Sequence, residues 1–148
     1  MLNPITITSI LRTIAFPALI SMGMVQLMIA GEIDLSTAAV MSFCAVLSAK
    51  LIRDFNFGIT EAVIIALFCS LLIGFINAIL TVKLGIFSVI ATIGTGFIVR
   101  GSSYLFTNGL PIYPLPESFA LLGSVRPLNI SFTFFLMLAV AFFVQLLL

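Results

Sequence analysis

Long apolar runs separated by short polar or glycine-containing connections dominate the chain. A bilayer core about 30 Å thick needs roughly 20 consecutive apolar residues in a helix. Runs close to that length, free of charge except for Lys50 near the end of the second, predict five membrane-spanning helices, at residues 14–30, 35–52, 62–82, 84–99 and 128–148. The pattern therefore predicts an all-α, polytopic helical membrane protein, with a single transmembrane domain over residues 1–148.

The longest connection in this pattern is the stretch 101–127. Its density of glycine and proline predicts an extramembrane or re-entrant loop. Arg100 closes the run before it, and an interfacial position avoids the roughly 2.5–3.5 kcal/mol that an arginine at mid-membrane costs. We therefore expect Arg100 to act as an interfacial anchor, and the candidate turn residues are Arg100, Gly101, Gly109 and Pro111.

Composition narrows the class of function. The chain is 62% hydrophobic and only 7% charged, against about 25% charged in soluble domains, so a bilayer is its expected environment. A net charge of +1 gives no basic surface for nucleic acid. The absence of histidine removes the commonest general base and metal ligand, and we expect no catalytic residues and no metal.

Two glycine patterns superficially suggest nucleotide binding. The stretch from Gly96 to Ser103 has P-loop spacing but lacks the phosphate-binding lysine. The pair Gly94 and Gly96 lacks the third glycine of a dinucleotide fingerprint. We therefore expect this chain to bind no cofactor, and any ATP it depends on would be hydrolysed by a partner subunit.

Glu32 and Asp34 stand between the first two runs, in Gly31-Glu32-Ile33-Asp34-Leu35-Ser36. Gly31 permits a helix break, and Asp34 or Ser36 can cap the helix that follows. The alternative is direct contact of the carboxylates with a solute or ion. Both roles can coexist, because broken helices inside membranes often line a path for solute.

The fourth run carries a stripe of small residues at helical spacing. The stripe favours close helix packing, or else its hydroxyls line a polar pathway. Asn77 in the third run poses the same choice, since a buried amide needs a partner from another helix or a passing solute. The stripe comprises Ser88, Ala91, Thr92, Thr95 and Gly96, and the candidates for the translocation path or helix break are Gly31, Glu32, Asp34, Ser36, Asn77, Thr92 and Thr95.

Several motifs follow one another in order along the chain: Gly31-Glu32-Ile33-Asp34-Leu35-Ser36, Gly74-Phe75-Ile76-Asn77, Thr92-Ile93-Gly94-Thr95, Arg100-Gly101 and Thr107-Asn108-Gly109-Leu110-Pro111-Ile112. In order and spacing this series resembles the permease subunits of bacterial ribose-type sugar ABC importers. The chain departs from the family pattern at Glu32, where glycine is usual, and at Asn108, where a second glycine is common.

The resemblance implies a multi-pass subunit of the bacterial inner membrane, normally about twice this length. Such a subunit pairs with a second permease copy and a cytoplasmic ATP-binding subunit, and a periplasmic protein delivers a monosaccharide such as ribose, xylose or galactose. Because the fifth run ends at Leu148 with no interfacial anchor, we expect the chain to be an N-terminal part of such a permease.

Charge and family imply opposite orientations. The positive-inside rule puts Arg12, Lys50, Arg53, Arg100 and Arg126 in the cytoplasm and leaves Lys83 alone on the other side. The family resemblance implies instead that the 101–127 loop is periplasmic, and we adopt that orientation.

Two other classes of function stay open at this point. One is a small membrane scaffold or channel complete at this length. The other is an intramembrane enzyme, which would need the Glu32 and Asp34 carboxylates to converge on a cavity.

Overall fold

A computed structural model describes residues 4–120 and 132–147. The chain divides into two compact units, one formed by residues 31–115 and the other by the segments before and after them. Each unit is described by itself.

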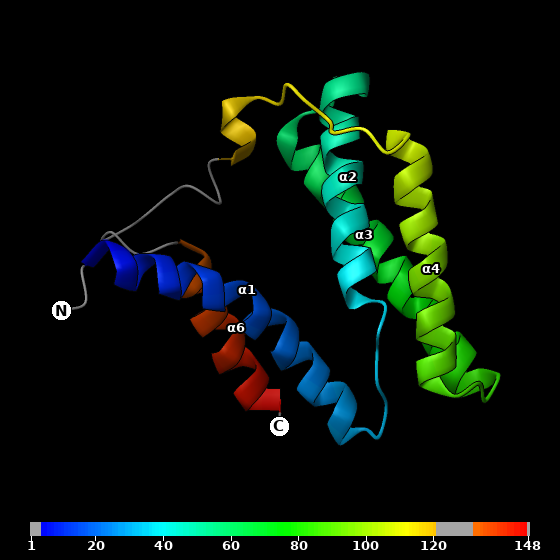
Figure 1. Ribbon diagram of the computed structural model, residues 1–148. Coiled ribbons are helices and arrows are strands. Elements are labelled where there is room, and N and C mark those ends of the chain that lie inside the picture. The colour runs from blue at the N-terminus through cyan, green and yellow to red at the C-terminus, as the bar shows by residue number, and fades with distance from the viewer. Residues whose placement is uncertain (1–3, 121–131, 148) are drawn as a thin grey trace. The chain divides into compact units, whose positions relative to one another are not determined.

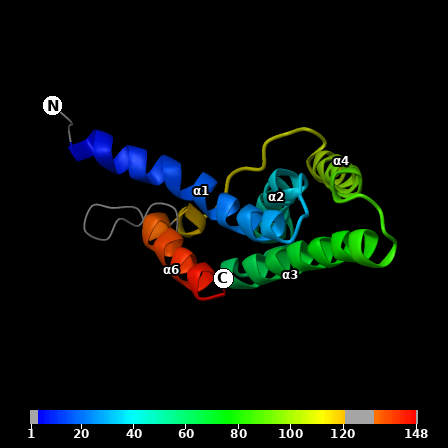
Figure 2. The same ribbon diagram turned by 90° about the horizontal axis from the view of Figure 1, so that it is seen from below.

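The unit of residues 31–115 is built from three long helices. They are α2 (Thr37–Phe55), α3 (Ile59–Ala78) and α4 (Ser88–Thr107), and a π-helical turn η1 (Ile79–Lys83) extends α3. α2 packs against both α3 and α4. α2 and α4 run side by side in the same direction, and α3 crosses them obliquely (Figure 1). Figure 2 shows α3 along its length, with the turn at its end that leads into α4.

Small side chains form the buried contacts in this unit. Ala39 and Ala49 of α2 and Ala62 and Ala66 of α3 are all buried. The Cys44 thiol also reaches across from α2, donating to the Ala66 carbonyl at 3.3 Å. Large apolar side chains are mostly exposed, so the helices meet through small residues and present bulky ones outward, as helices in lipid do.

Three helices in the described part of the chain are long and apolar enough to cross a membrane. They are Thr8–Ile29, Ile59–Lys83 and Ser88–Thr107. α2 has the length but carries Lys50, Arg53 and Asp54 near its end, where Lys50 pairs with Asp54 at 2.7 Å. That hydrogen bond, together with the charge of Arg53, holds the pKa of Asp54 below its usual value.

The fourth predicted run and the loop after it need correction. The helix continues to Thr107, so Arg100 lies within α4 and the described loop begins at Asn108, not at Gly101. The helix does not end at Arg100. A helix interior tolerates Gly101, and the residues from there to Thr107 include no proline that would interrupt it. Asn108 then ends the helix in the left-handed conformation (φ 51°), followed by Gly109 (φ 70°). Asparagine adopts this conformation more readily than most residues, so Asn108 is compatible with the turn. Residues 121–127 of the predicted loop lie outside the described residues.

The other unit contains α1 (Pro4–Ile29), the short 3-10 helix η2 (Glu117–Ala120) and α6 (Phe132–Leu147). α1 and α6 pack against each other, and Ala15 of α1 is fully buried. α1 begins earlier than the predicted run, because Arg12 is charged but does not interrupt the helix. Residues 128–131 of the predicted fifth run lie outside the described part. The structure thus has a helix for each of the five predicted runs, which confirms the all-α prediction.

Candidate functional site

A non-helical segment, Gly31–Ser36, leads into α2 and lies along α4 (Figure 1). It is extended between the turn at Gly31 and Ser36, whose backbone already has helical angles (φ −84°, ψ −16°). Gly31 adopts a positive φ of 80°, which glycine reaches without the strain a side chain would add. The backbone N–H of Ile33 donates to Ser88 Oγ at 3.3 Å, and that of Leu35 donates to Thr92 Oγ1 at 3.1 Å. The Thr92 hydroxyl itself donates to the Ser88 carbonyl at 2.7 Å, leaving its oxygen free to accept from Leu35.

The two hydrogen bonds fit because two different backbone repeats have nearly the same length. Residues two apart in an extended chain are separated by about 6.6 Å, and residues four apart in a helix by about 6.0 Å. Ile33 and Leu35 therefore match Ser88 and Thr92 in register. Gly96, one further turn along, continues the row and lies against Ser36, since a Cβ added at Gly96 would be in ordinary contact with Ser36 Cα, at 3.5 Å.

This row explains how non-helical backbone can exist beside a membrane-spanning helix. In hydrocarbon an unpaired backbone N–H costs several kcal/mol, so irregular backbone persists only where protein or water satisfies it. Here the hydroxyls of Ser88 and Thr92, both buried, satisfy two of those groups. The stripe of small residues in α4 is thus a seat for the segment Gly31–Ser36.

Ser36 joins the segment to α3 through a buried polar chain. Asp34 Oδ1 accepts from both the backbone N–H and the hydroxyl of Ser36, each at 2.6 Å. Ser36 Oγ in turn accepts from Asn77 Nδ2 at 3.0 Å. Ser36 is the N-cap residue of α2, but its side chain makes no capping hydrogen bond, so the predicted side-chain cap is wrong for this residue. The Asp34 carboxylate and the Asn77 amide occupy its hydroxyl.

Asn77 is buried, with 6% of its surface exposed, and its Oδ1 has no hydrogen-bond partner among the described residues. Reversing the amide would not repair this, because Ser36 Oγ already donates its hydrogen to Asp34 and needs a donor on its other side.

Two substitutions at Asn77 are expected to differ sharply. Asn77→Leu removes one hydrogen bond, worth about 0.6 kcal/mol on average between membrane helices, together with the unpaired oxygen. Asn77→Asp replaces the donating NH₂ with an oxygen and places a second carboxylate near Asp34, costing about 2.5–3.5 kcal/mol on insertion scales. Thermal unfolding of the intact permease in detergent should therefore rank Asn77→Leu well above Asn77→Asp. Equal stability would show that a donor reaches position 77 from outside the described residues.

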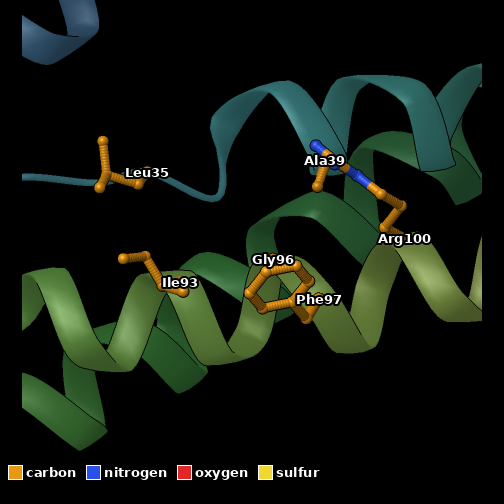
Figure 3. A pocket seen from close by; sticks show the side chains of 6 residues that line it. All are labelled: Leu35, Ala39, Ile93, Gly96, Phe97 and Arg100. Atoms are coloured by element: carbon orange, nitrogen blue, oxygen red, sulfur yellow. The ribbon is translucent and has the colours of Figure 1, made fainter.

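A hollow opens beside the segment, between the start of α2 and α4. Its volume is about 120 Å³, and its lining is Leu35, Ala39, Ile93, Gly96, Phe97 and Arg100. Figure 3 shows the Arg100 side chain extending from α4 toward Ala39, with Phe97 and Ile93 along α4 and Leu35 on the extended segment.

The structure brings together four of the candidate residues, Asp34, Ser36, Asn77 and Thr92. Glu32 takes no part in their hydrogen bonds, and Thr95 donates only to carbonyls of its own helix. Gly101 lies within α4, whereas Gly109 lies in the turn after it and Pro111 in the irregular stretch that follows the turn. Within the described residues no group of three or more carboxylate or cysteine side chains could hold a metal ion.

Sequence reasoning missed Ser88 as a site residue, and it missed the hollow. The available signal was the row Ser88, Thr92 and Gly96 at intervals of four, beside a segment whose backbone cannot be helical. The hollow had no comparable signal, since Leu35, Ala39, Ile93 and Phe97 are ordinary residues of apolar runs.

Comparison with known proteins shows the family to which the chain belongs. Residues 6–148 match the family described as branched-chain amino acid transport system / permease component. The chain belongs to this family. It is a multi-pass membrane permease chain, and membership favours transport over the enzyme and scaffold alternatives.

Individual relatives of the permease chain agree with this assignment. Xylose/arabinose import permease protein XylH of Sulfolobus acidocaldarius is 32% identical over 111 residues, covering 71% of this chain and 31% of the relative. Autoinducer 2 import system permease protein LsrC of Escherichia coli K12 is 31% identical over 126 residues, covering 85% and 36%. LsrC of Yersinia pestis is 31% identical over 141 residues, covering 92% and 40%.

The matched part of the permease chain thus spans between about a third and two fifths of the length of these relatives. No solved structure matches the chain.

Proposed function

We propose that the chain forms part of the translocation path of an ABC importer that carries a monosaccharide. In this proposal residues 1–148 belong to one transmembrane permease domain of the bacterial inner membrane. The observation that carries it is the extended segment Gly31–Ser36, held against α4 by Ser88 and Thr92. Non-helical backbone that is satisfied by side chains is how membrane transporters place polar groups at the depth of the bilayer.

Family membership and the relatives support the substrate class. A permease of this family whose relatives include a xylose/arabinose importer is expected to carry a pentose or a related sugar. Autoinducer 2 is the second candidate substrate, because the LsrC relatives match a larger share of the chain than XylH does.

The proposal includes three partners. A cytoplasmic ATP-binding subunit supplies the energy, since neither glycine pattern of this chain has the residues of a nucleotide site. A periplasmic binding protein delivers the sugar, and a second permease copy completes the path. The turn after α4, beginning at Asn108, then faces the periplasm.

Reconstitution tests the proposal. We expect the intact permease, assembled in proteoliposomes with its ATP-binding subunit and binding protein, to take up labelled xylose, arabinose, ribose or galactose only when ATP is present. Omitting the binding protein is the matched control and should abolish the uptake. Uptake of autoinducer 2 but of no monosaccharide would favour the second candidate. Failure to take up any pentose, hexose or autoinducer 2 would refute the importer proposal.

A further inference from the structure

We propose that Phe97 and Arg100 form a contact site for the transported sugar in the hollow between the start of α2 and α4. The inference rests on the proposed function and adds to it the residues that meet the solute. The reasoning starts from the space itself. At about 120 Å³ the hollow greatly exceeds the roughly 10–15 Å³ that one water needs, so it admits several waters or one small solute.

The hollow exists because two of its lining residues are small. Ala39 comes from the first turn of α2, and Gly96 from the row of α4 that seats Ser36. The larger residues Ile93, Phe97 and Arg100 follow at intervals of four and three, so they share one face of α4. The same packing that fixes the extended segment therefore leaves this face of α4 open beside it.

Arg100 is the charged group of the hollow, and its environment is unusual. It is the thirteenth of the 20 residues of α4, a helix apolar enough to span a membrane. Among the described residues its guanidinium takes part in neither of the ion pairs, which join Lys50 and Arg53 to Asp54. An arginine in a spanning helix costs about 2.5–3.5 kcal/mol unless it meets water or a polar partner, which favours a polar occupant for the hollow.

The chemistry of the lining fits a sugar. A guanidinium presents a planar fork of donors that can reach two neighbouring hydroxyl oxygens. Phe97 is 67% exposed, and its ring offers an apolar surface beside that fork. A monosaccharide has the same two characters, with hydroxyls at its edge and C–H groups on its face. Ligand sites in general combine a mainly apolar lining with a few polar groups that set orientation.

The alternative occupant is an anionic lipid headgroup, which an arginine also binds. The apolar lining from Leu35, Ile93 and Phe97 favours a neutral solute, because it supplies no second cation for a phosphate. The two occupants make different predictions, since a sugar site responds to substrate and a headgroup site responds to the lipid composition.

Cysteine protection in the complete transporter tests the site. Phe97→Cys and, as a matched control, Phe75→Cys are introduced after Cys44 and Cys69 have been replaced by alanine. Phe75 is of the same residue type and similarly exposed, at 64%, but lies on α3 away from the hollow. During ATP-driven turnover, transported sugar should slow the reaction of a small thiol reagent about tenfold at position 97 and leave position 75 unchanged.

A second measurement avoids reliance on the cysteine variants. Arg100→Lys keeps the charge but loses the planar fork, and should lower the ratio of uptake between two competing sugars about tenfold relative to the parent. Phe75→Leu should leave that ratio at the parental value. A merely structural role of Arg100 would lower uptake of both sugars equally.

The outcomes separate the two proposals. Uptake by the parent with no protection at position 97 and an unchanged sugar ratio in Arg100→Lys overturns the site and leaves the proposed function standing. Protection at position 97 that depends on the phosphatidylglycerol content of the vesicles and not on the sugar also overturns the sugar site, in favour of a lipid headgroup. No uptake by the parent overturns both.

Discussion

Replacing Asp34 with alanine is expected to destabilise the permease more than any other single carboxylate substitution in the extended segment. Asp34 Oδ1 accepts two hydrogen bonds of 2.6 Å from Ser36, and hydrogen bonds to a charged group are worth about 1.5–3 kcal/mol each. Because the two bonds share one oxygen, their combined loss should lower the free energy of unfolding by about 2–3 kcal/mol. Denaturation of the intact permease in detergent measures this change.

The effect should extend to transport. Without Asp34 the Ser36 hydroxyl loses the acceptor that orients it toward Asn77, so the connection between α2 and α3 weakens. We expect ATP-driven uptake by Asp34→Ala to fall at least about tenfold, while Asp34→Asn, which keeps an accepting oxygen, retains more activity.

Glu32 supplies the matched control for this prediction. It is a carboxylate two residues away in the same segment, with no part in the Ser36 network. Glu32→Ala should change stability by less than about 0.5 kcal/mol. Equal losses from the two alanine variants would mean that negative charge in the segment, and not the Ser36 turn, is what matters. Loss of uptake in both with stability intact would point instead to direct contact of the two carboxylates with the solute.

Replacing Gly96 with isoleucine is the second substitution with a large expected effect. A Cβ at this position would lie 3.5 Å from Ser36 Cα and 3.9 Å from the Leu35 carbonyl oxygen, which is ordinary contact. Gly96→Ala should therefore be accepted. The further carbons of isoleucine have to enter the space of the segment, and overpacking of this kind costs about 1–3 kcal/mol.

The displacement should add a second cost. Moving Leu35 away from α4 breaks its backbone bond to Thr92, and an unpaired backbone N–H in hydrocarbon costs several kcal/mol. We expect Gly96→Ile to unfold at a clearly lower temperature than the parent and to lose uptake. Gly94→Ile is the control, because nothing lies within 4 Å of a Cβ at Gly94 on the same helix. A tolerated Gly96→Ile would show that the segment does not need its seat on α4.

Helix positions and membrane class could be predicted from the sequence because both depend on local properties. A run such as 62–82 is apolar over the length that a bilayer requires, and the structure places α3 with η1 at Ile59–Lys83. The predicted helix boundaries were wrong where a single charged residue was expected to end a helix. Arg100 is accommodated within α4 because its side chain extends into the hollow, where some of the neighbouring residues are small.

The candidate site could be predicted only in part. The sequence predicts that certain polar residues need partners in an apolar chain, namely Asp34, Ser36, Asn77 and Thr92. It does not predict which partner each of them has. The cap expected from Ser36 competes with the Asp34 and Asn77 contacts, and the competition depends on where α3 lies. The outcome of this competition depends on the position of α3 relative to Ser36, which the order of residues along the chain does not specify.

The sequence by itself determined an all-helical membrane protein with a break at Gly31–Ser36, because apolar run length and glycine placement act through neighbouring residues. Only the tertiary structure decided what holds the break and what faces the hollow. The bonds from Ile33 to Ser88 and from Leu35 to Thr92 join residues 55 and 57 positions apart. Whether such distant groups meet depends on the packing of α2, α3 and α4, and that packing is a property of the assembled helices.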